Sequence, residues 1–338
     1  MAGSSFGTDL VAHMPVARAA DGTWGTSTMG PLEPLAMHPA SHALHYGSAC
    51  FEGLKAHRGV DGVVRIFRLA DHVRRLQGSA EILVLPVPPA DLVAGMITDL
   101  VRASLDDVPE APGALYLRPT LLGTLEHIGA AAEPSRDALL FVLAARVGDY
   151  FTNDGSAFVV AVETELPRTT PQFGMVKAGA NYAMALGPTR AATAASGAAQ
   201  VLFTRDGAVE ETGASNVLLL DGERIVTPAL TSSFLHGVTR ASLLELGADL
   251  GYEIEERRVE LDEVLAWAAR PDGEIALSGT AAVLRGVDEL VVDGERVTVG
   301  GGVAGGHPNA DRLRSALLDL QQGRAEDRHG WCTAVHSA

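Results

Sequence analysis

The sequence predicts an α/β protein of two domains, and three observations support this expectation. The chain has 338 residues, which is long enough for two domains. Strand-like apolar runs and helix-like periodic segments are mixed along its whole length. The polar, glycine-containing stretch GDYFTNDGS lies between two apolar strand-like runs. We therefore expect a smaller N-terminal α/β domain over 1–148, an interdomain linker over 149–156 and a larger C-terminal domain over 157–338.

The expected strands are short apolar runs bounded by turn signals. They are VVRIF, ALLFVLAA, AFVVAVE, QVLFT, NVLLL and RIVTP, at 63–67, 138–145, 157–163, 200–204, 216–220 and 224–228. The dipeptides Asp206-Gly207 and Asp221-Gly222 are typical of turns and separate neighbouring strands in the second half of the chain.

The expected helices follow from apolar residues at three- and four-residue spacing. In 68–83 this spacing places on one face Leu69, Val73, Leu76, Ala80 and Leu83. The alanine-rich segment 181–197 predicts a second helix, interrupted at Gly187-Pro188. The segments 238–251 and 309–323 predict two more, each stopped by a glycine.

Composition excludes several classes of protein. The 26 basic against 42 acidic residues give a net charge of −16, which argues against nucleic acid or an anionic membrane surface as a partner. No stretch approaches the ~20 apolar residues of a membrane span, and we see no signal peptide. The two cysteines, Cys50 and Cys332, cannot form a disulfide framework or a cysteine zinc cage. We therefore expect a reduced, cytoplasmic protein.

Three histidines form an H-x3-H-x2-H spacing that could suggest zinc: His38, His42 and His45. The residues between them indicate no clear helix that would align the rings, and no carboxylate lies close by in the sequence. We expect no metal site here.

Lysine is nearly absent from this chain, and that makes each lysine informative. Lys55 and Lys177 are the two lysines, against 24 arginines. This background favours arginine wherever positive charge alone is needed. A lysine can lose its proton and act as an amine nucleophile, which an arginine cannot do. Lys177 is therefore a candidate catalytic amine, although the residue could also be an ordinary surface lysine.

Pyridoxal phosphate chemistry needs a set of groups that the sequence contains. It needs a lysine amine, an acid that keeps the ring nitrogen protonated, phosphate donors and a donor for the phenolic oxygen. Lys177, Glu211, Arg75 and Tyr182 match these types, and LHGVTR matches a helix start. Each also has an ordinary explanation: Glu211 could form a solvated pair with Glu210, and Arg75 could be an exposed helix charge.

The set in its order resembles the branched-chain amino-acid aminotransferases, which are fold-type IV pyridoxal phosphate enzymes of the class IV aminotransferase family. The resemblance covers nearly the whole chain. It rests on ordered blocks that include FGTDLVAHM, HPASHALHYGSACFEGLKAHRG, RIFRLADHVRRLQGSA, LYLRPTLLG, KAGANY, VEETGASN, FLHGVTR, SGTAA and DRHGW. It implies two domains, each with a sheet or barrel-like core and flanking helices, the C-terminal one binding pyridoxal phosphate.

The resemblance also implies roles for the cofactor residues. Lys177 of KAGANY would form the Schiff base and move the proton between the substrate Cα and the cofactor. Glu211 would pair with the pyridine nitrogen, Tyr182 would bind the phenolic oxygen, and Arg75 would bind the phosphate. The remaining phosphate donors would be the backbone at Val238 and Thr239 and the hydroxyl of Thr280.

For the substrate, the resemblance implies an apolar pocket with one arginine. The backbone at Thr280 and Ala281 would receive the α-carboxylate. Tyr116 and Arg118 would let one pocket take both an apolar side chain and the glutamate carboxylate. The pocket wall would comprise Phe51, Gly53, Val147 and Tyr150, with Tyr46 contributed by the neighbouring subunit of a homodimer. The implied reaction is ping-pong transamination of leucine, isoleucine or valine with 2-oxoglutarate.

Two departures from the family pattern keep alternatives open. The residues that vary in VEETGASN are Thr212, Ala214 and Ser215, and the loop 121–136 does not closely match the family's pocket loop. His127 of that loop could face solvent or substrate. The alternatives on the same fold are a specialised-metabolism aminotransferase, a D-amino-acid aminotransferase, an aminodeoxychorismate lyase or an amine transaminase. A protein that binds the cofactor without turnover is a further alternative from another class.

Overall fold

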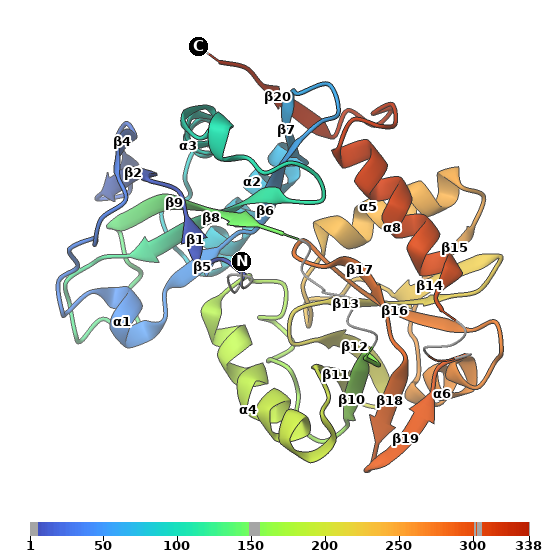
Figure 1. The fold of residues 1–338 in the computed structure, drawn as a ribbon. Helices are drawn as coiled ribbons and strands as arrows, with labels where there is room; N and C mark the ends of the chain where they lie inside the picture. Colours follow the sequence, from blue (N-terminus) through green and yellow to red (C-terminus); the bar gives the residue numbers. More distant parts are fainter. Residues whose placement is uncertain (1–5, 149–155, 301, 303–305, 338) are drawn as a thin grey trace. The chain divides into compact units, whose positions relative to one another are not determined.

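The structure is a computed structural model that describes residues 6–148, 156–300, 302 and 306–337 (Figure 1). The chain forms two compact units. The first comprises Met1–Tyr150, Val176–Gly179 and Asp319–Ala338, and the second comprises Phe151–Met175 and Ala180–Leu318. This grouping differs from a single C-terminal domain over 157–338, because two segments of that range join the first unit.

Within the described residues, the first unit holds a ten-stranded sheet with the central order β20-β7-β6-β8-β9-β2-β3. Three further strands pair beside this path, β1 with β9, β4 with β2 and β5 with β8. The bounds are β1 Asp9–Leu10, β2 His13–Ala20, β3 Thr23–Trp24, β4 Thr28–Pro31, β5 Ala49–Phe51, β6 Leu54–Arg58, β7 Val64–Phe67, β8 Ala114–Gly123, β9 Ala138–Val147 and β20 Cys332–Val335. The antiparallel pairing of β20 with β7 is what ties the C-terminal segment to this unit.

Two helices cover one face of this sheet, α2 (Leu69–Ile82) and α3 (Ala90–Ala103), as Figure 1 shows. A short helix α1 (His42–Tyr46) and a 3₁₀ turn (Leu105–Asp107) complete the unit. The core between helices and sheet includes Leu76, Ile97, Leu115 and Leu117. Since side chains alternate along a strand, the residues between those of β8 point to the opposite face. Tyr116 on that face packs in a separate small cluster with Ala114, Val147 and Phe6.

The second unit holds another ten-stranded sheet in the described residues, with the central order β15-β14-β13-β12-β11-β10-β18-β19. The strand β16 pairs with β13 and β17. The bounds are β10 Val159–Glu163, β11 Gln200–Arg205, β12 Ala208–Thr212, β13 Asn216–Leu220, β14 Arg224–Pro228, β15 Glu253–Arg257, β16 Glu274–Gly279, β17 Val283–Gly286, β18 Glu289–Val292 and β19 Glu295–Thr298. The helices are α4 (Gly179–Ser196), α5 (Val238–Asp249), α6 (Leu261–Ala268) and α8 (Pro308–Gln321).

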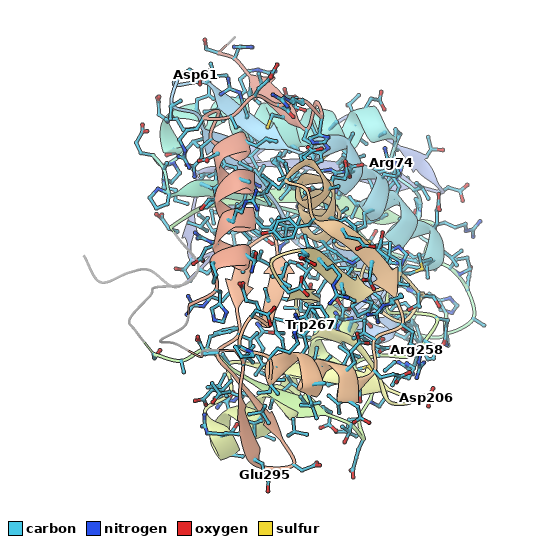
Figure 2. The ribbon with its side chains drawn as sticks, turned by 90° about the vertical axis from the view of Figure 1, so that its right-hand side faces the viewer. Asp61, Arg74, Asp206, Arg258, Trp267 and Glu295 are labelled. Carbon is cyan, nitrogen blue, oxygen red and sulfur yellow. The ribbon has the colours of Figure 1, made fainter. Side chains whose placement is uncertain are left out.

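Apolar clusters hold this second sheet to its helices. Trp267 of α6, labelled in Figure 2, is 5% exposed and belongs to the larger cluster. Its indole N–H donates to the carbonyl of Leu220 at 2.9 Å. A smaller cluster joins Ala185 of α4 to Val201 and Phe203 of β11. Burial of this apolar surface stabilises the sheet that carries β12 and β13.

The strand and helix predictions are largely confirmed, with one correction. All six expected strands are present, as are the helices expected at 68–83, 238–251 and 309–323. The interruption expected at Gly187-Pro188 is wrong, because α4 runs through Pro188. A proline lacks only the N–H that would reach the carbonyl four residues earlier, so α4 continues through Pro188 without that one hydrogen bond.

No helix in the described residues has the length and apolarity that crossing a membrane would require.

Candidate active site

Lys177 lies in the short segment that joins the first unit, and its backbone is fixed on both sides. Its N–H donates to the hydroxyl of Ser79 on α2 at 3.2 Å. Its carbonyl accepts from the N–H of Phe51, the last residue of β5, at 3.0 Å. The Nζ atom lies 5.1 Å from the centroid of the Phe51 ring. A helix and a strand of the first unit therefore hold the predicted catalytic amine.

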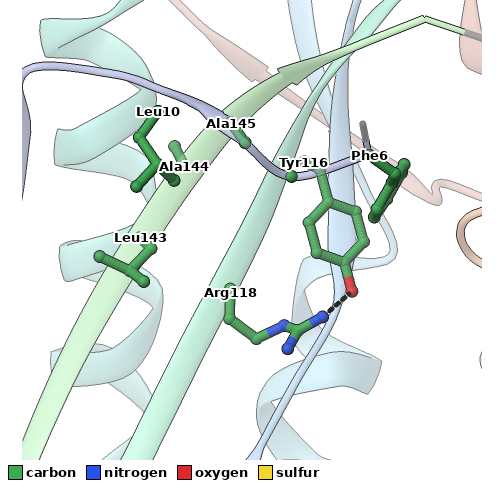
Figure 3. Close-up of a pocket in the computed structure, with 8 residues that line it drawn as sticks. Phe6, Leu10, Tyr116, Arg118, Leu143, Ala144 and Ala145 are labelled. Carbon is green, nitrogen blue, oxygen red and sulfur yellow. Dashed lines mark hydrogen bonds between the residues drawn. The ribbon is translucent and has the colours of Figure 1, made fainter. Parts of the chain in front are cut away.

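The same aromatic ring also contacts Arg118 of β8. The guanidinium carbon lies 4.5 Å from the centroid of Phe51 and 5.2 Å from that of Tyr116. Its Nη2 donates to the Tyr116 hydroxyl at 2.9 Å, the bond drawn in Figure 3. A Cβ at Gly53 would lie 2.1 Å from that hydroxyl, so only glycine leaves room for Tyr116. Two aromatic faces and one hydrogen bond thus preorganise this arginine.

Tyr116 and Arg118 line a pocket of about 250 Å³ in the first unit (Figure 3). The other lining residues are mostly small or apolar: Phe6, Gly7, Leu10, Leu143, Ala144 and Ala145. The ring of Phe6 packs edge-on against Tyr116 with the centroids 4.9 Å apart. Val147, one of the predicted pocket residues, is buried beside Tyr116 in the same cluster. The pocket is apolar with a single cation, which suits an apolar side chain and a carboxylate alike.

Arg75 of α2 is 12% exposed and forms a two-point ion pair with Glu52, which corrects the view of it as an exposed charge. Its Nε and Nη2 donate to the two carboxylate oxygens at 2.6 and 2.8 Å. His72, one turn earlier, contacts Glu52 Oε2 through Nδ1 at 2.8 Å. Burial alone would raise the pKa of Glu52, but the charge and hydrogen bonds of Arg75, with help from His72, hold it well below its usual range. Burial lowers the pKa of His72 despite its bond to Glu52.

In the second unit, Glu211 of β12 is held in place by several donors. The N–H of Leu235 donates to Oε1 at 2.9 Å, and Nδ2 of Asn216 donates to Oε2 at 3.1 Å. Arg168 pairs with Oε1 at an N···O distance of 2.6 Å, and both side chains are 2% exposed. Glu210 points elsewhere: it is also buried but pairs with Arg205, so the two acids are not a solvated pair.

The first turn of α5 begins near this carboxylate. Val238 and Thr239 are its first two residues, both buried, and Gly237 precedes them with no side-chain cap. A Cβ at Gly237 would lie 2.0 Å from Oδ1 of Asn216, and Asn216 in turn donates to Glu211. A helix start of this kind offers backbone N–H groups to an anion. Asn216 therefore connects the acid to a potential phosphate-binding turn.

Thr280 and Ala281 lie in the turn between β16 and β17. β16 pairs with β13 in a register that sets Ser278 opposite Asn216. Asn216 is also the partner of Glu211 across β12 and β13. The second unit thus brings the acid, the start of α5 and the Thr280 turn to neighbouring strand ends. Tyr182, half-buried, lies in the first turn of α4.

Comparisons with known proteins show the family of this chain. The family model described as amino-transferase class IV matches residues 49–290, more than half of the chain. The chain is 36% identical to the probable branched-chain-amino-acid aminotransferase of Streptomyces coelicolor, over 98% of this chain and 92% of that protein. It is likewise 36% identical to the branched-chain-amino-acid transaminase 1 of Bacillus subtilis, over 92% and 88%.

The chain belongs to the class IV aminotransferase family, among its branched-chain-amino-acid aminotransferases.

Among solved structures, the fold is similar to that of the T.th. branched-chain amino acid aminotransferase solved with pyridoxamine 5'-phosphate. The TM-score is 0.78 at 26% identity, covering 95% of this chain and 98% of the other. That enzyme was also solved with N-(5'-phosphopyridoxyl)-L-glutamate and with 4-methylvaleric acid. The expected fold-type IV architecture is thereby confirmed.

Of the other predicted residues, Tyr46 and His127 are not among those that line the pocket of Figure 3, and Tyr150 falls outside the described residues. Tyr46 is at the end of α1, 36% exposed, and its hydroxyl donates to the carbonyl of Ile128. Tyr150 and most of the linker expected at 149–156 fall outside the described residues. In the loop expected to shape the pocket, His127 is half-exposed and pairs with Glu133 at 3.3 Å.

The histidine spacing considered for zinc is used for local hydrogen bonds. His42 bonds through its ring nitrogens to Ser48 and to carbonyls of the 130–133 loop, and His45 bonds to the carbonyl of Pro39. In the part of the chain that the structure describes, no group of three or more metal-ligating side chains could hold an ion.

Four residues that the sequence analysis gave no role contact predicted site residues within their own units: Glu52, Arg168, Asn216 and Phe6. Glu52 lies inside the block FEGLKA and Asn216 ends the block VEETGASN. Both blocks support the resemblance, but the sequence assigned neither residue a function. Arg168 carried no signal, because one arginine among 24 is unremarkable until its burial beside Glu211 is known. Phe6 was in the block FGTDLVAHM, but only the fold brings it to Tyr116.

Proposed function

We propose that this aminotransferase transfers the amino group of L-leucine, L-isoleucine or L-valine to 2-oxoglutarate by a ping-pong mechanism. The observation that carries the proposal is the apolar pocket with Arg118 held between Phe51 and Tyr116. Apolar walls suit the branched side chain, and the guanidinium suits the extra carboxylate of glutamate or 2-oxoglutarate. The names of the relatives and the glutamate- and 4-methylvaleric-acid-containing structures of the T.th. enzyme support the same substrates.

The cofactor is pyridoxal phosphate, and the donor set of this chain fits it. Glu211 is a buried carboxylate with fixed orientation, as a ring nitrogen requires. The start of α5 carries no side-chain cap and no acidic residue in its first turn, as a phosphate requires. In this proposal the cofactor contacts are made by Arg75, Lys177, Tyr182, Glu211, Val238, Thr239 and Thr280.

Bound pyridoxal phosphate supplies an electron sink for the negative charge that develops at the substrate α-carbon. Lys177 would hold the cofactor through its Nζ, and the same amine would take and return the substrate α-proton. Glu211, paired with Arg168, would hold the proton on the ring nitrogen. The Phe51 ring under Nζ limits where the amine can move.

The substrate α-carboxylate is received by the backbone at Thr280 and Ala281 in this proposal. Phe51, Gly53, Tyr116, Val147 and Tyr150 form the side-chain pocket with Arg118. Because Glu52 lies between Phe51 and Gly53 and is anchored to α2, the pocket wall has little freedom to shift. A rigid wall favours discrimination among apolar side chains of different shape.

The assembly and location follow the sequence-based expectation. We propose a homodimer in which Tyr46 reaches the neighbouring subunit's pocket, in the cytoplasm. The partial exposure of Tyr46 and its position at the end of α1 support a contact outside its own chain. The domains over 1–148 and 157–338 with a linker over 149–156 likewise stay a prediction.

A steady-state assay with purified protein and pyridoxal phosphate tests the proposal. L-leucine with 2-oxoglutarate should yield glutamate and the 2-oxo acid of leucine in equal amounts. D-leucine in the same assay should yield neither. Turnover with D-amino acids, or with L-leucine only when another oxo acid replaces 2-oxoglutarate, would contradict the proposed substrates while leaving the family intact.

A further inference from the structure

A buried charge cluster of the first unit lies at Glu52, a residue to which no role has been assigned. The Glu52 side chain is 1% exposed and accepts from three directions. Arg75 donates to both oxygens, His72 contacts Oε2, and the N–H of Gly53 donates to Oε2 at 3.1 Å. A buried carboxylate needs this many donors because its desolvation is costly.

The cluster connects two elements of the site. Arg75 and His72 lie three residues apart on α2, so both side chains project from one face of that helix. Glu52 lies between β5 and β6, next to Phe51 and Gly53. The N–H of Glu52 donates to the carbonyl of Pro119 in β8 at 2.8 Å, which fixes its backbone to the sheet. The carboxylate therefore anchors the helix arginine to a rigid strand framework.

Arg74, the neighbouring arginine on α2, is a useful comparison because its side chain is largely exposed. Arg74 has a side chain 73% exposed and pairs with Asp71 on its own helix. Such a side chain keeps most of its rotamer freedom, and its ion pair contributes little. Arg75 instead has its planar guanidinium held at two points, so its orientation is set before any ligand arrives.

We propose that Glu52 is a positioning residue that orients Arg75 for the phosphate group of the cofactor. This rests on the proposed function, in which Arg75 binds that phosphate. Two-point pairing through Nε and Nη2 fixes the guanidinium plane, and preorganised donors bind an anion without the cost of ordering a long side chain. His72 and Gly53 support the carboxylate from its Oε2 side.

The test compares two cofactors, pyridoxal phosphate and unphosphorylated pyridoxal, in the wild type and in Glu52→Gln. Dissociation constants are measured on apoprotein by visible absorbance. Glu52→Gln should weaken pyridoxal phosphate binding by about 10- to 100-fold, the range for losing a charge-assisted contact. It should change pyridoxal binding less than about threefold, since pyridoxal has no phosphate. Arg74→Ala is the matched control and should change neither.

The outcomes separate this inference from the proposed function. If Glu52→Gln weakens the binding of pyridoxal phosphate and of pyridoxal equally, Glu52 is a general structural residue and the inference is overturned. Full retention of the phosphate preference in Glu52→Gln would overturn it as well. A wild type with no preference for pyridoxal phosphate would instead remove the phosphate role of Arg75. If Glu52→Gln does not fold, Glu52→Asp replaces it, because it keeps the charge on a shorter side chain. This variant should weaken the binding of pyridoxal phosphate and leave that of pyridoxal unchanged. Unchanged binding of pyridoxal phosphate would contradict the proposal.

Discussion

Arg168 and Glu211 form a buried ion pair inside the second unit, with an N···O distance of 2.6 Å and both side chains 2% exposed. Removing one partner of such a pair leaves a charge without compensation in a low-dielectric site. We expect Arg168→Met to lower the free energy of unfolding by about 3–5 kcal/mol, measured by urea denaturation with excess cofactor. Arg205→Met breaks the more exposed pair with Glu210 and serves as the comparison. It should lower the free energy of unfolding clearly less. Equal losses would show that burial of the Arg168 pair is not what matters.

We expect the two adjacent acids of β12 to contribute differently to the rate of catalysis. Glu211→Ala should reduce kcat by roughly 10²-fold or more, the size typical for one electrostatic group in an active site, because nothing would hold the ring proton. Glu210→Ala should keep most of the turnover, since Glu210 pairs with Arg205 instead. Steady-state kinetics with L-leucine measure both. A larger loss in Glu210→Ala would mean that the roles of the two acids are reversed.

Arg118 should discriminate between the two substrates of the reaction. Arg118→Ala removes the one guanidinium of the apolar pocket. We expect kcat/KM for glutamate to fall about 10- to 100-fold, as for a lost hydrogen bond to a charged group. The value for leucine should fall much less. An equal fall for both substrates would contradict a selective contact with the side-chain carboxylate.

His57 should give the unfolding free energy a specific pH dependence. Burial lowers the pKa of this histidine to about 3, with a further contribution from the charge of Lys55. In the unfolded chain the ring titrates near its ordinary value of about 6.5. Between these values the unfolded chain binds one more proton here than the folded chain. Stability therefore falls as the pH falls, by about 1.4 kcal/mol per pH unit from this residue.

Replacing His57 by leucine tests that assignment. Neither ring nitrogen of His57 has a hydrogen-bond partner in the described part of the chain, so leucine breaks no bond. We expect the slope of unfolding free energy against pH, between pH 4.5 and 6, to be smaller in His57→Leu by about 1.4 kcal/mol per unit. Urea denaturation across this range measures the slope. Parallel slopes in the two proteins would refute the role of His57.

The limits of sequence-based prediction follow from particular residues. Lys177 could be predicted as a site residue because lysine is rare in this chain, and Arg75, Glu211 and Tyr182 because their ordered blocks resemble a known family; these roles stay predictions. The helix α3 was missed although Val93, Ile97 and Leu100 carry a helical spacing. The interruption expected at Pro188 was wrong because a proline removes one helical hydrogen bond, which α4 tolerates in this fold.

Partners that depend on burial could not be predicted. Arg168 reaches Glu211 across 43 positions of sequence, and Glu52 reaches Arg75 across 23. A single chain without its fold gives no sign of such pairs, because ion pairing is decided by which side chains become buried together. Local sequence patterns predict the general fold. The contacts that support the predicted site residues are long-range, and local patterns do not predict them.

Borohydride reduction tests the central claim most directly, because the chain has only two lysines. Reducing the protein loaded with pyridoxal phosphate converts a Schiff base into a stable bond, and peptide mass spectrometry then locates the added mass. We expect the cofactor on Lys177, with Lys55 unlabelled and a loss of turnover in proportion to labelling. Label on Lys55, or a protein that binds the cofactor without becoming labelled on either lysine, would contradict it.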